Sequence, residues 1–379
     1  MRYTFLFIMI IIVYSCEDKK KVSSYDYYLS ENQEYEVEID ASISPVPAAV
    51  QYVPEENIVI LNNRYANDRS LIVIDAKTFQ FRHKIKFDSE GENSPQANPL
   101  NFYYHNKDSL FLVNIFSKKL YLLDSMGKTL YKTFDFNGFA TFIDQWQLGM
   151  GNNEGNFSQG VFQIICEPND MMNTEKSKND PLLAYLNLEI GEMKISRLTY
   201  GLNNPFNIPI QHPWLQVPLT TTTQEGTLLT FGHSKSIYLI NDDGVHKEIP
   251  LKSDFFDDFD KMKKFDNQEL DKFYVESYCI DRLFHDKQNQ LTYVFLYHAI
   301  PYVNKDTGKM NSYEDKPFSV IVLDSSFKKL TEQKFEGSKY SLMGSFTTSE
   351  GLFLSLNNPH SETFNENLFK YKQFKLTHK

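Results

Sequence analysis

Side chains that could form a binding site recur where predicted strands end. They include amides, imidazoles, a guanidinium and an indole, which bind sugars or peptides through hydrogen bonds and ring stacking. The candidates are Asn63, Arg64, Asn101, His212, Trp214, His233, His298 and Asn357. Arg64 and Trp214 are the strongest of them, because Arg and Trp recur as anchors in binding sites. The alternative is that the asparagines and histidines only hydrogen-bond the backbone of turns.

Three of the histidines could instead act in catalysis. With a carboxylate such as Glu167, they could form the acid–base pair of a hydrolase or lyase; they are His212, His233 and His298. The sequence contains no G-x-S-x-G, H-E-x-x-H, C-x-x-C or Walker-type phosphate motif, however. Its nine histidines are dispersed without the spacing of metal ligands, so we expect no metal site and no cofactor. The residue types therefore favour binding over catalysis.

The elements that would position these residues follow a repeat. Residues 71–87 read LIVIDAKTFQFRHKIKF, an apolar strand, a polar turn and a strand that alternates apolar and charged residues. The same pattern, typical of a β-hairpin, recurs at residues 120–136, 184–200, 237–251 and 320–335. Two further strands precede each hairpin, as in residues 48–53 and 57–62. Four antiparallel strands in each unit indicate a β-propeller blade.

Six such units fill residues 34–379, and the last is one outer strand short. Its strands lie at residues 340–347, 352–356 and 368–376, and Tyr35–Asp40 (YEVEID) supplies the missing one. We therefore predict an all-β, six-bladed propeller closed by its N- and C-terminal strands. A seven-bladed ring is the alternative, if the third or fifth unit contains an extra hairpin. Residues 253–273 carry aromatic side chains near helical spacing and predict a helical insertion with Ser253 as its N-cap.

The connections differ between the two faces of this propeller. If the strands of a blade run A to D from the axis outward, the A–B and C–D turns share one face and are short; we call it the short-turn face. The B–C and D–A connections share the other, the long-loop face, and include residues 88–98, 167–181, 201–211, 298–316, 357–367 and the insertion. Long loops on a rigid scaffold usually carry binding function, so we expect the candidate residues to rim a pocket there.

The N-terminus has the features of an exported, lipid-anchored protein. Residues 1–15 contain one basic residue and an apolar run too short to span a bilayer, which is typical of a signal peptide. The quartet Val13 to Cys16 resembles a bacterial lipobox, so we expect lipidation of Cys16. Residues 16–33 are polar and read as a tether. The membrane partner would be reached through this anchor, on the cell surface or the periplasmic side of the outer membrane.

Charge and cysteine content limit the partners further. The formal net charge is −10, and loss of Arg2 with the signal peptide would make it more negative, so nucleic acid is not expected to bind. Beyond Cys16 the chain holds Cys166 and Cys279, both in apolar runs. Export would permit a disulfide between them, but two separate buried thiols are the alternative that we favour.

The signal, the tether and the repeated hairpins together resemble a family of uncharacterised six-bladed propeller lipoproteins of the Bacteroidetes, catalogued as a domain of unknown function. The resemblance extends over essentially the whole chain and implies the fold, but it assigns no functional residue. We expect an envelope lipoprotein that binds a glycan, a peptide or an envelope protein on its long-loop face. A glycan-active hydrolase or lyase with an axial pocket is the alternative, and a purely structural envelope component is a third possibility.

Overall fold

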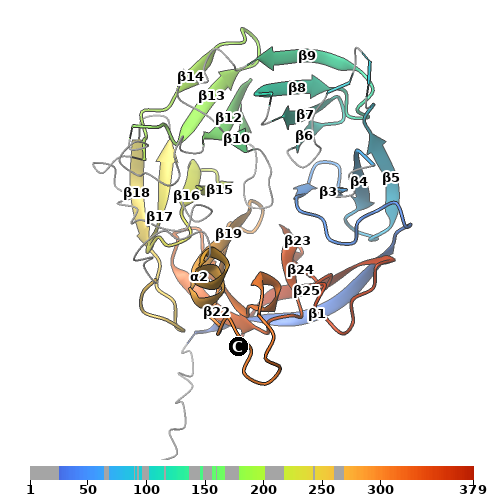
Figure 1. Ribbon diagram of the computed structural model, residues 1–379. Coiled ribbons are helices and arrows are strands. Elements are labelled where there is room, and N and C mark those ends of the chain that lie inside the picture. Colours follow the sequence, from blue (N-terminus) through green and yellow to red (C-terminus); the bar gives the residue numbers. More distant parts are fainter. Residues whose placement is uncertain are drawn as a thin grey trace, which may run out of the picture.

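Six antiparallel sheets surround a central axis in the computed structural model (Figure 1). The structure describes residues 25–63, 68–88, 90–91, 94–95, 102–114, 117–135, 146–147, 156–158, 160–166, 179–200, 217–241, 244–259 and 269–379. Each sheet is one blade, and in the first five blades the first strand along the chain lies nearest the axis. Within these residues the ring has six blades, as the hairpin repeat predicts, and not seven.

The strands follow the chain around the ring. Blades 1 and 2 contain β2 (Val50–Val53), β3 (Ile58–Asn62), β4 (Ser70–Asp75) and β5 (Phe81–Lys86), then β6 (Phe102–Asn106), β7 (Ser109–Asn114), β8 (Lys119–Leu123) and β9 (Leu130–Asp135). Blade 3 contains β10 (Trp146–Gln147), β11 (Asn156–Ser158), β12 (Val161–Cys166), β13 (Leu183–Asn187) and β14 (Met193–Ile195). Blade 4 contains β15 (Leu219–Thr222), β16 (Thr227–Thr230), β17 (Ser236–Asn241) and β18 (Gly244–Pro250). Blade 5 contains β19 (Cys279–Asp286), β20 (Leu291–Tyr297), β21 (Phe318–Leu323) and β22 (Lys329–Phe335).

Blade 6 closes the ring by combining both ends of the chain. It contains β23 (Ser341–Thr348), β24 (Gly351–Ser355) and β25 (Leu368–His378), and its outer strand is β1 (Tyr27–Glu38). β1 pairs antiparallel with β25, from Tyr27 opposite His378 to Glu38 opposite Leu368. The predicted closure is therefore confirmed. β1 begins eight residues before Tyr35, the first residue of the predicted strand, so residues 27–33 belong to the sheet and not to a tether.

Apolar side chains fill the spaces between blades. The described residues form six buried clusters, and each draws its members from two neighbouring blades. The cluster between blades 5 and 6 includes Leu29 of β1, and the one between blades 6 and 1 includes Val37 of the same strand. Because β1 contributes to both of these cores, its burial stabilises the junction at which the ring closes.

The predicted helix from residue 253 is wrong in its position. Ser253–Phe259 contains no helix, residues 260–268 lie outside the described residues, and the helix α2 spans Leu270–Glu276. The Ser253 hydroxyl donates a hydrogen bond to Glu332 Oε1 of β22 instead of capping a helix. Tertiary contacts thus override the local aromatic spacing. The predicted packing is nevertheless confirmed, since Phe256 and Phe259 join the core between blades 4 and 5.

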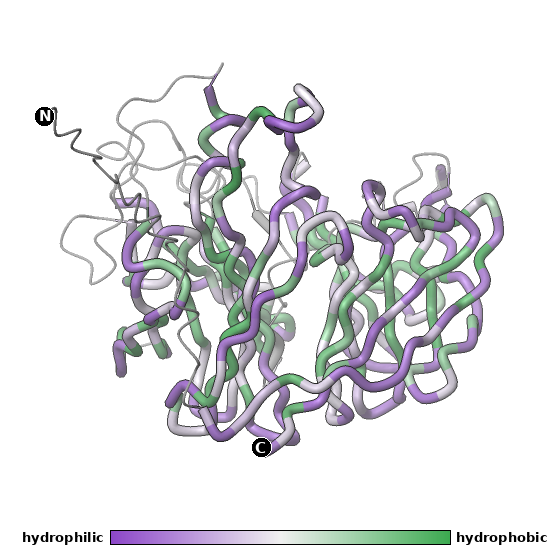
Figure 2. The backbone as a smooth tube through the Cα atoms, turned by 90° about the horizontal axis from the view of Figure 1, so that it is seen from below, coloured by the Kyte–Doolittle hydropathy of each residue, from purple (hydrophilic) through white to green (hydrophobic). Residues whose placement is uncertain are grey.

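The described connections differ between the two faces in part as predicted: the long ones lie on the long-loop face, which also has two short connections, residues 231–235 and 336–340. Figure 2 shows the ring from its side, with projecting segments at one end and short turns at the other. The described long connections are residues 298–317, which contain the 3-10 turn Tyr313–Asp315, residues 356–367, and the segments on either side of residues 260–268. No helix in the described part of the chain is long and apolar enough to cross a membrane.

Candidate functional site

Half of the candidate residues cannot be placed. Arg64, Asn101, His212 and Trp214 lie outside the described residues, as do Glu167 and Cys16. The other four are Asn63, His233, His298 and Asn357, and all of them are at least 95% buried. The site must therefore be assembled from what surrounds these buried side chains on the long-loop face.

The side chains of two candidate asparagines hydrogen-bond to backbone groups of neighbouring segments. Asn63 accepts a hydrogen bond from the Ser44 N–H (2.9 Å) and donates one to the Ser42 carbonyl (2.7 Å). Asn357 donates to the Leu368 carbonyl (2.6 Å), at the start of the neighbouring strand. Buried amides with both ends bonded to backbone are not available to a ligand. For these two residues the alternative that we considered, turn-stabilising strand ends, is the correct one.

His298 belongs to a buried chain of hydrogen bonds at the end of β20. Its Nε2 lies 3.0 Å from Ser319 Oγ, and the Ser319 hydroxyl donates to Glu332 Oε1 at 2.8 Å. Since the single hydroxyl proton points at the carboxylate, His298 donates through Nε2. Burial, reinforced by the charges of nearby lysines, lowers the pKa of His298 to about 3, so it is neutral at physiological pH. The serine proton is directed away from the histidine, opposite to the order in a nucleophilic triad.

His233, the other described histidine among the candidates, packs between aromatic rings. It stacks on Phe259 with 5.5 Å between ring centroids and meets the edge of Phe273 at 5.8 Å. Its exposed fraction is only 5%. A general base must reach a substrate proton, and neither this imidazole nor that of His298 does so.

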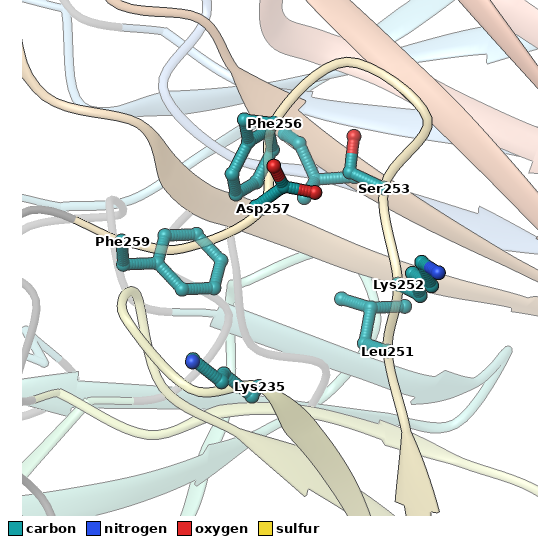
Figure 3. A pocket seen from close by; sticks show the side chains of 8 residues that line it. Lys235, Leu251, Lys252, Ser253, Phe256, Asp257 and Phe259 are labelled. Atoms are coloured by element: carbon teal, nitrogen blue, oxygen red, sulfur yellow. The ribbon is translucent and has the colours of Figure 1, made fainter.

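A cavity of about 50 Å³ lies on the long-loop face, at the junction of blades 4 and 5. Figure 3 shows Phe256 and Phe259 on one side of it, Leu251 and Lys252 on another, and Lys235 between them. The complete lining is Lys235, Leu251, Lys252, Ser253, Phe256, Asp257, Phe259 and Leu296. Binding pockets share such aromatic and aliphatic walls with a few charged groups, but this cavity is much smaller than the roughly 300–1,000 Å³ of a small-molecule site.

The segment that forms this cavity, residues 251–259, is fastened to blade 5 by Glu332. The Glu332 side chain is fully buried and accepts from the Ser253 hydroxyl (2.7 Å) and the Asp254 N–H (2.7 Å), besides Ser319. Lys329 Nζ completes the set at 2.6 Å. A carboxylate with four donors is well compensated for its loss of water, so the segment is held rigidly.

Charged groups lie both at the base of the segment, where it meets blade 5, and at the rim of the cavity. At the base, burial opposes the charge of Lys329, but its hydrogen bond to Glu332 and the charge of that carboxylate prevail and raise its pKa. At the rim, Lys235 Nζ lies 2.9 Å from Asp258 Oδ1, with about 60% of both side chains exposed. An ion pair this exposed is weak and can be exchanged for a partner's charge. The rim is therefore the adaptable part of the site.

The aromatic side chains that pack the segment against the ring also form the wall of the cavity. Phe256 stacks on Tyr278 with 4.4 Å between ring centroids and meets the edge of Phe259 at 5.0 Å. Leu251 is fixed by a hydrogen bond from its N–H to the Lys235 carbonyl (2.7 Å). The wall is thus preformed, which reduces the entropy lost on binding.

A second buried polar cluster lies near the axis, beneath residues 298–317. Arg282 Nε pairs with Asp281 Oδ2 at 2.9 Å, and the Tyr313 hydroxyl donates to Asp281 Oδ1 at 2.8 Å. Lys316 donates to the carbonyls of Tyr274 and Ser277 at the end of α2, while burial lowers its pKa. Asp281 and Arg282 thus form an internal ion pair. No group of three metal-ligating side chains occurs in the described ranges.

Sequence reasoning missed the residues that build the cavity. Glu332 lies in an outer strand with alternating polarity, where a carboxylate is usually solvated, yet it is buried together with its neighbour Thr331. Glu332 departs from the alternation because the segment 251–259 covers it; Ser253 of that segment lies 79 residues away in the chain. The aromatic run at residues 255–259 was the available signal, but it was assigned to a helix.

Comparisons with known proteins agree with the fold. A scan against protein families matches residues 26–334 to DUF4221, a domain of unknown function. A search of curated proteins finds no match. Among solved structures, a DUF4221 family member from Bacteroides vulgatus ATCC 8482 has a TM-score of 0.78 at 18% identity, over 94% of this chain and 99% of that one.

Two more distant structures share the general architecture. A candidate exported protein from Bacteroides fragilis NCTC 9343 has a TM-score of 0.50 at 8% identity, over 93% of this chain and 96% of that one. A streptogramin B lyase has a TM-score of 0.44 at 10% identity, over 92% and 98% of the two chains, too low to bear on function. The family match spans most of the chain and confirms the resemblance to a propeller family of unknown function. The protein is therefore a member of the DUF4221 family, whose function is unknown.

Proposed function

We propose that this protein is an envelope binding module, anchored to the outer membrane through a lipid on Cys16, that captures a protein or peptide partner. The observation that carries the proposal is the preformed cavity at the junction of blades 4 and 5. It lies on the long-loop face, where a rigid ring presents its variable segments. The partner inserts one side chain into the cavity and covers the surrounding rim.

The size of the cavity favours a peptide over a glycan. A dry cavity of about 150 Å³ holds one benzene molecule, and this one has about a third of that volume, 50 Å³. It therefore accommodates the end of one side chain, while a sugar ring is larger than benzene. A glycan would have to bind outside the cavity.

The chemistry of the lining specifies the inserted group. Leu251, Phe256, Phe259 and Leu296 provide apolar walls, so the inserted side chain is apolar. Lys235, Lys252 and Asp257 also line the cavity; the two lysines can pair with a carboxylate that neighbours the inserted residue, for which Lys235 would exchange its exposed pair with Asp258. We infer a partner segment that presents an apolar side chain next to an acidic one.

The catalytic alternative has no support in the described part of the chain. Of the three histidines considered for a hydrolase or lyase, His233 and His298 are buried among aromatic rings. Binding is the activity that the geometry supports best.

Capture of the partner from detergent-solubilised native membranes tests the proposal. The bait is the acylated protein, and the test variants are Leu251→Phe, which fills the cavity, and the pair Lys235→Glu and Lys252→Glu, which reverses the rim charge. We expect a stoichiometric partner on the wild-type bait and a loss of at least tenfold with either variant. Lys194→Glu, an exposed lysine of β14 in blade 3, is the matched control and should retain the partner.

Two results would refute this assignment. A partner retained by both cavity variants would place binding elsewhere, and Arg64→Ala and Trp214→Ala would then locate it. Radiolabelled palmitate that does not enter the wild-type protein, or that still enters Cys16→Ser, would refute the anchor. The two readouts are independent, so the binding site and the anchor can fail separately.

A further inference from the structure

A β-hairpin projects from the long-loop face of blade 5, between β20 and β21. Val303 and Met310 form an antiparallel bridge, flanked by hydrogen bonds from the Asn304 N–H to the Lys309 carbonyl (2.8 Å) and from the Asn311 N–H to the Tyr302 carbonyl (2.7 Å). In Figure 1 it is the orange loop beside α2 at the lower edge of the ring. We call residues 301–311 the blade 5 hairpin.

The tip of the blade 5 hairpin has a fixed shape. The Asn304 side chain accepts hydrogen bonds from the N–H groups of Asp306 (2.9 Å) and Thr307 (3.1 Å). Gly308 closes the turn with φ +69°, a conformation that favours glycine. The tip is therefore an ordered turn made by its own residues.

The base of the blade 5 hairpin is attached to α2. The Tyr302 N–H donates to Glu276 Oε1 (3.1 Å), and the Ile300 N–H donates to the Val275 carbonyl (3.1 Å). Lys316, just beyond the hairpin, bonds to the last carbonyls of the same helix. The hairpin is thus presented at a defined angle by the body of the propeller.

Its two bridging side chains are apolar and exposed. Val303 is 51% exposed and Met310 is 69% exposed, the highest value for a large apolar side chain in the described part of the chain. A bridge of this kind, with hydrogen bonds on either side of it, places the two side chains close together on one face. A rigid projection that holds paired apolar side chains in water needs a functional reason.

The surrounding charges identify the surface that covers these side chains. Lys305 and Lys309 are exposed at the tip, with only Asp306 to offset them, so the tip is positive in a protein of net charge −10. Apolar side chains flanked by lysines suit the boundary of a lipid bilayer, where the apolar groups enter and the ammonium groups meet phosphates. A soluble protein partner would not require both the apolar side chains and the flanking lysines.

Tyr25, the first described residue, packs against blade 5. The Tyr25 hydroxyl donates to Asp254 Oδ1 (3.1 Å), and its ring lies over Lys329 Nζ of β22. Eight residues lie between Cys16 and Tyr25, and the nine steps from one to the other span at most about 32 Å when the chain is extended. Lys329 begins β22 at the short-turn end of blade 5, however, so Tyr25 and the blade 5 hairpin lie toward opposite ends of the blade, and the membrane contact rests on the hairpin's own side chains.

We propose that the blade 5 hairpin is a membrane contact, in which Val303 and Met310 enter the headgroup–acyl boundary and Lys305 and Lys309 pair with lipid phosphates. The inference goes beyond the proposed function, because none of these four residues lines the cavity. It also predicts membrane binding without the lipid anchor, because the hairpin itself supplies the contact.

Vesicle sedimentation of the unacylated chain, residues 17–379, tests the proposal. This chain retains every described strand, and the vesicles contain phosphatidylethanolamine with phosphatidylglycerol, at low salt. The pair Val303→Ser and Met310→Ser should lower the partition coefficient at least tenfold, since each fully buried apolar side chain contributes about that factor. Lys305→Glu with Lys309→Glu should lower it at least fivefold, and only on anionic vesicles. Met126→Ser, a 48% exposed methionine on the short-turn face, is the matched control.

Tryptophan emission provides a second readout that does not depend on affinity. Met310→Trp should shift to the blue when vesicles are added, and Met126→Trp should not. A wild-type chain that fails to bind vesicles, or serine variants that bind as well as the wild type, would overturn the proposal. A hairpin variant that loses a protein partner while vesicle binding stays absent would instead assign the hairpin to a protein interface.

Discussion

Replacing His298 tests whether the buried hydrogen-bonded chain is built around a neutral imidazole. The change is His298→Gln, because a glutamine amide can still donate to Ser319 but does not titrate. In the wild type, burial and the charges of Lys334 and Lys316 lower the pKa of His298 from 6.5 to about 3. The folded state therefore excludes a proton that the unfolded chain binds readily below pH 6.5.

The sign and size of the effect follow from this difference. A group whose pKa is lowered on folding contributes its full stability above the unfolded value and loses it as the pH falls toward the folded value. Each pH unit between 6.5 and 3 removes about 1.4 kcal/mol. Between pH 7 and pH 5 the His298 contribution to the free energy of unfolding should fall by about 2 kcal/mol.

Urea denaturation at pH 7 and pH 5, followed by circular dichroism, measures this loss. Other groups titrate too, such as His285, whose pKa burial lowers to about 4. The informative quantity is therefore the difference between wild type and variant. We expect His298→Gln to lose about 2 kcal/mol less than the wild type between the two pH values. His378→Gln, at an exposed position, should behave as the wild type does, and parallel losses in wild type and His298→Gln would refute the reasoning.

Three further predictions concern the ring itself. Leu29→Ala should lower the free energy of unfolding by about 2–4 kcal/mol in a denaturant titration, because this side chain of β1 is 2% exposed in the core between blades 5 and 6. Cys166 and Cys279 are both fully buried, and burial raises both pKa values, that of Cys279 to about 11, so a thiol reagent should modify them only after denaturation. Gly351→Ala should cost about 3 kcal/mol, since φ is +127° and an added Cβ would lie 2.3 Å from the Phe374 carbonyl oxygen.

Neighbouring positions provide the controls for these predictions. Tyr28, next to Leu29 but 40% exposed, should tolerate alanine. Gly308 has φ +69° with open space around it, so alanine there should cost only about 1 kcal/mol. Equal losses at Gly351 and Gly308 would contradict the steric argument, and rapid labelling of either cysteine in native buffer would contradict their burial. A Leu29→Ala protein as stable as the wild type would show that β1 is dispensable for closure.

The sequence predicts the ring well because a strand of a blade is recognisable from local information. The run at residues 71–87 changes from apolar to alternating at a polar turn, and the structure places β4 and β5 there. The closing strand could also be predicted from the sequence, since residues 35–40 alternate between apolar and acidic and have no other strand to pair with. Both features depend on apolar residues that repeat every second position and on the residue types in the turn. Residues close together in the chain determine both of these.

The candidate site was harder to predict from the sequence, because it depends on contacts between segments that are distant in the chain. An asparagine at a strand end has the same sequence context whether its amide meets a ligand or, as for Asn63, the backbone of an adjacent loop. Residues 253–259 show helical spacing, but Glu332 supplies hydrogen bonds that hold them in another conformation. The exposed pair Val303 and Met310 could not be recognised without the bridge that aligns them.

The pairing of the first strand with the last also constrains how the protein is made. β1 leaves the ribosome before any other strand and cannot pair with β25 until the end of the chain has been synthesised. During that delay it is an unpaired edge, which is an aggregation hazard. Its acidic residues Glu31, Glu34 and Glu36 would repel waiting copies of the same strand and later pair with Lys370 and Lys372 of β25. The charges that fasten the finished ring would thus also keep unfinished chains apart.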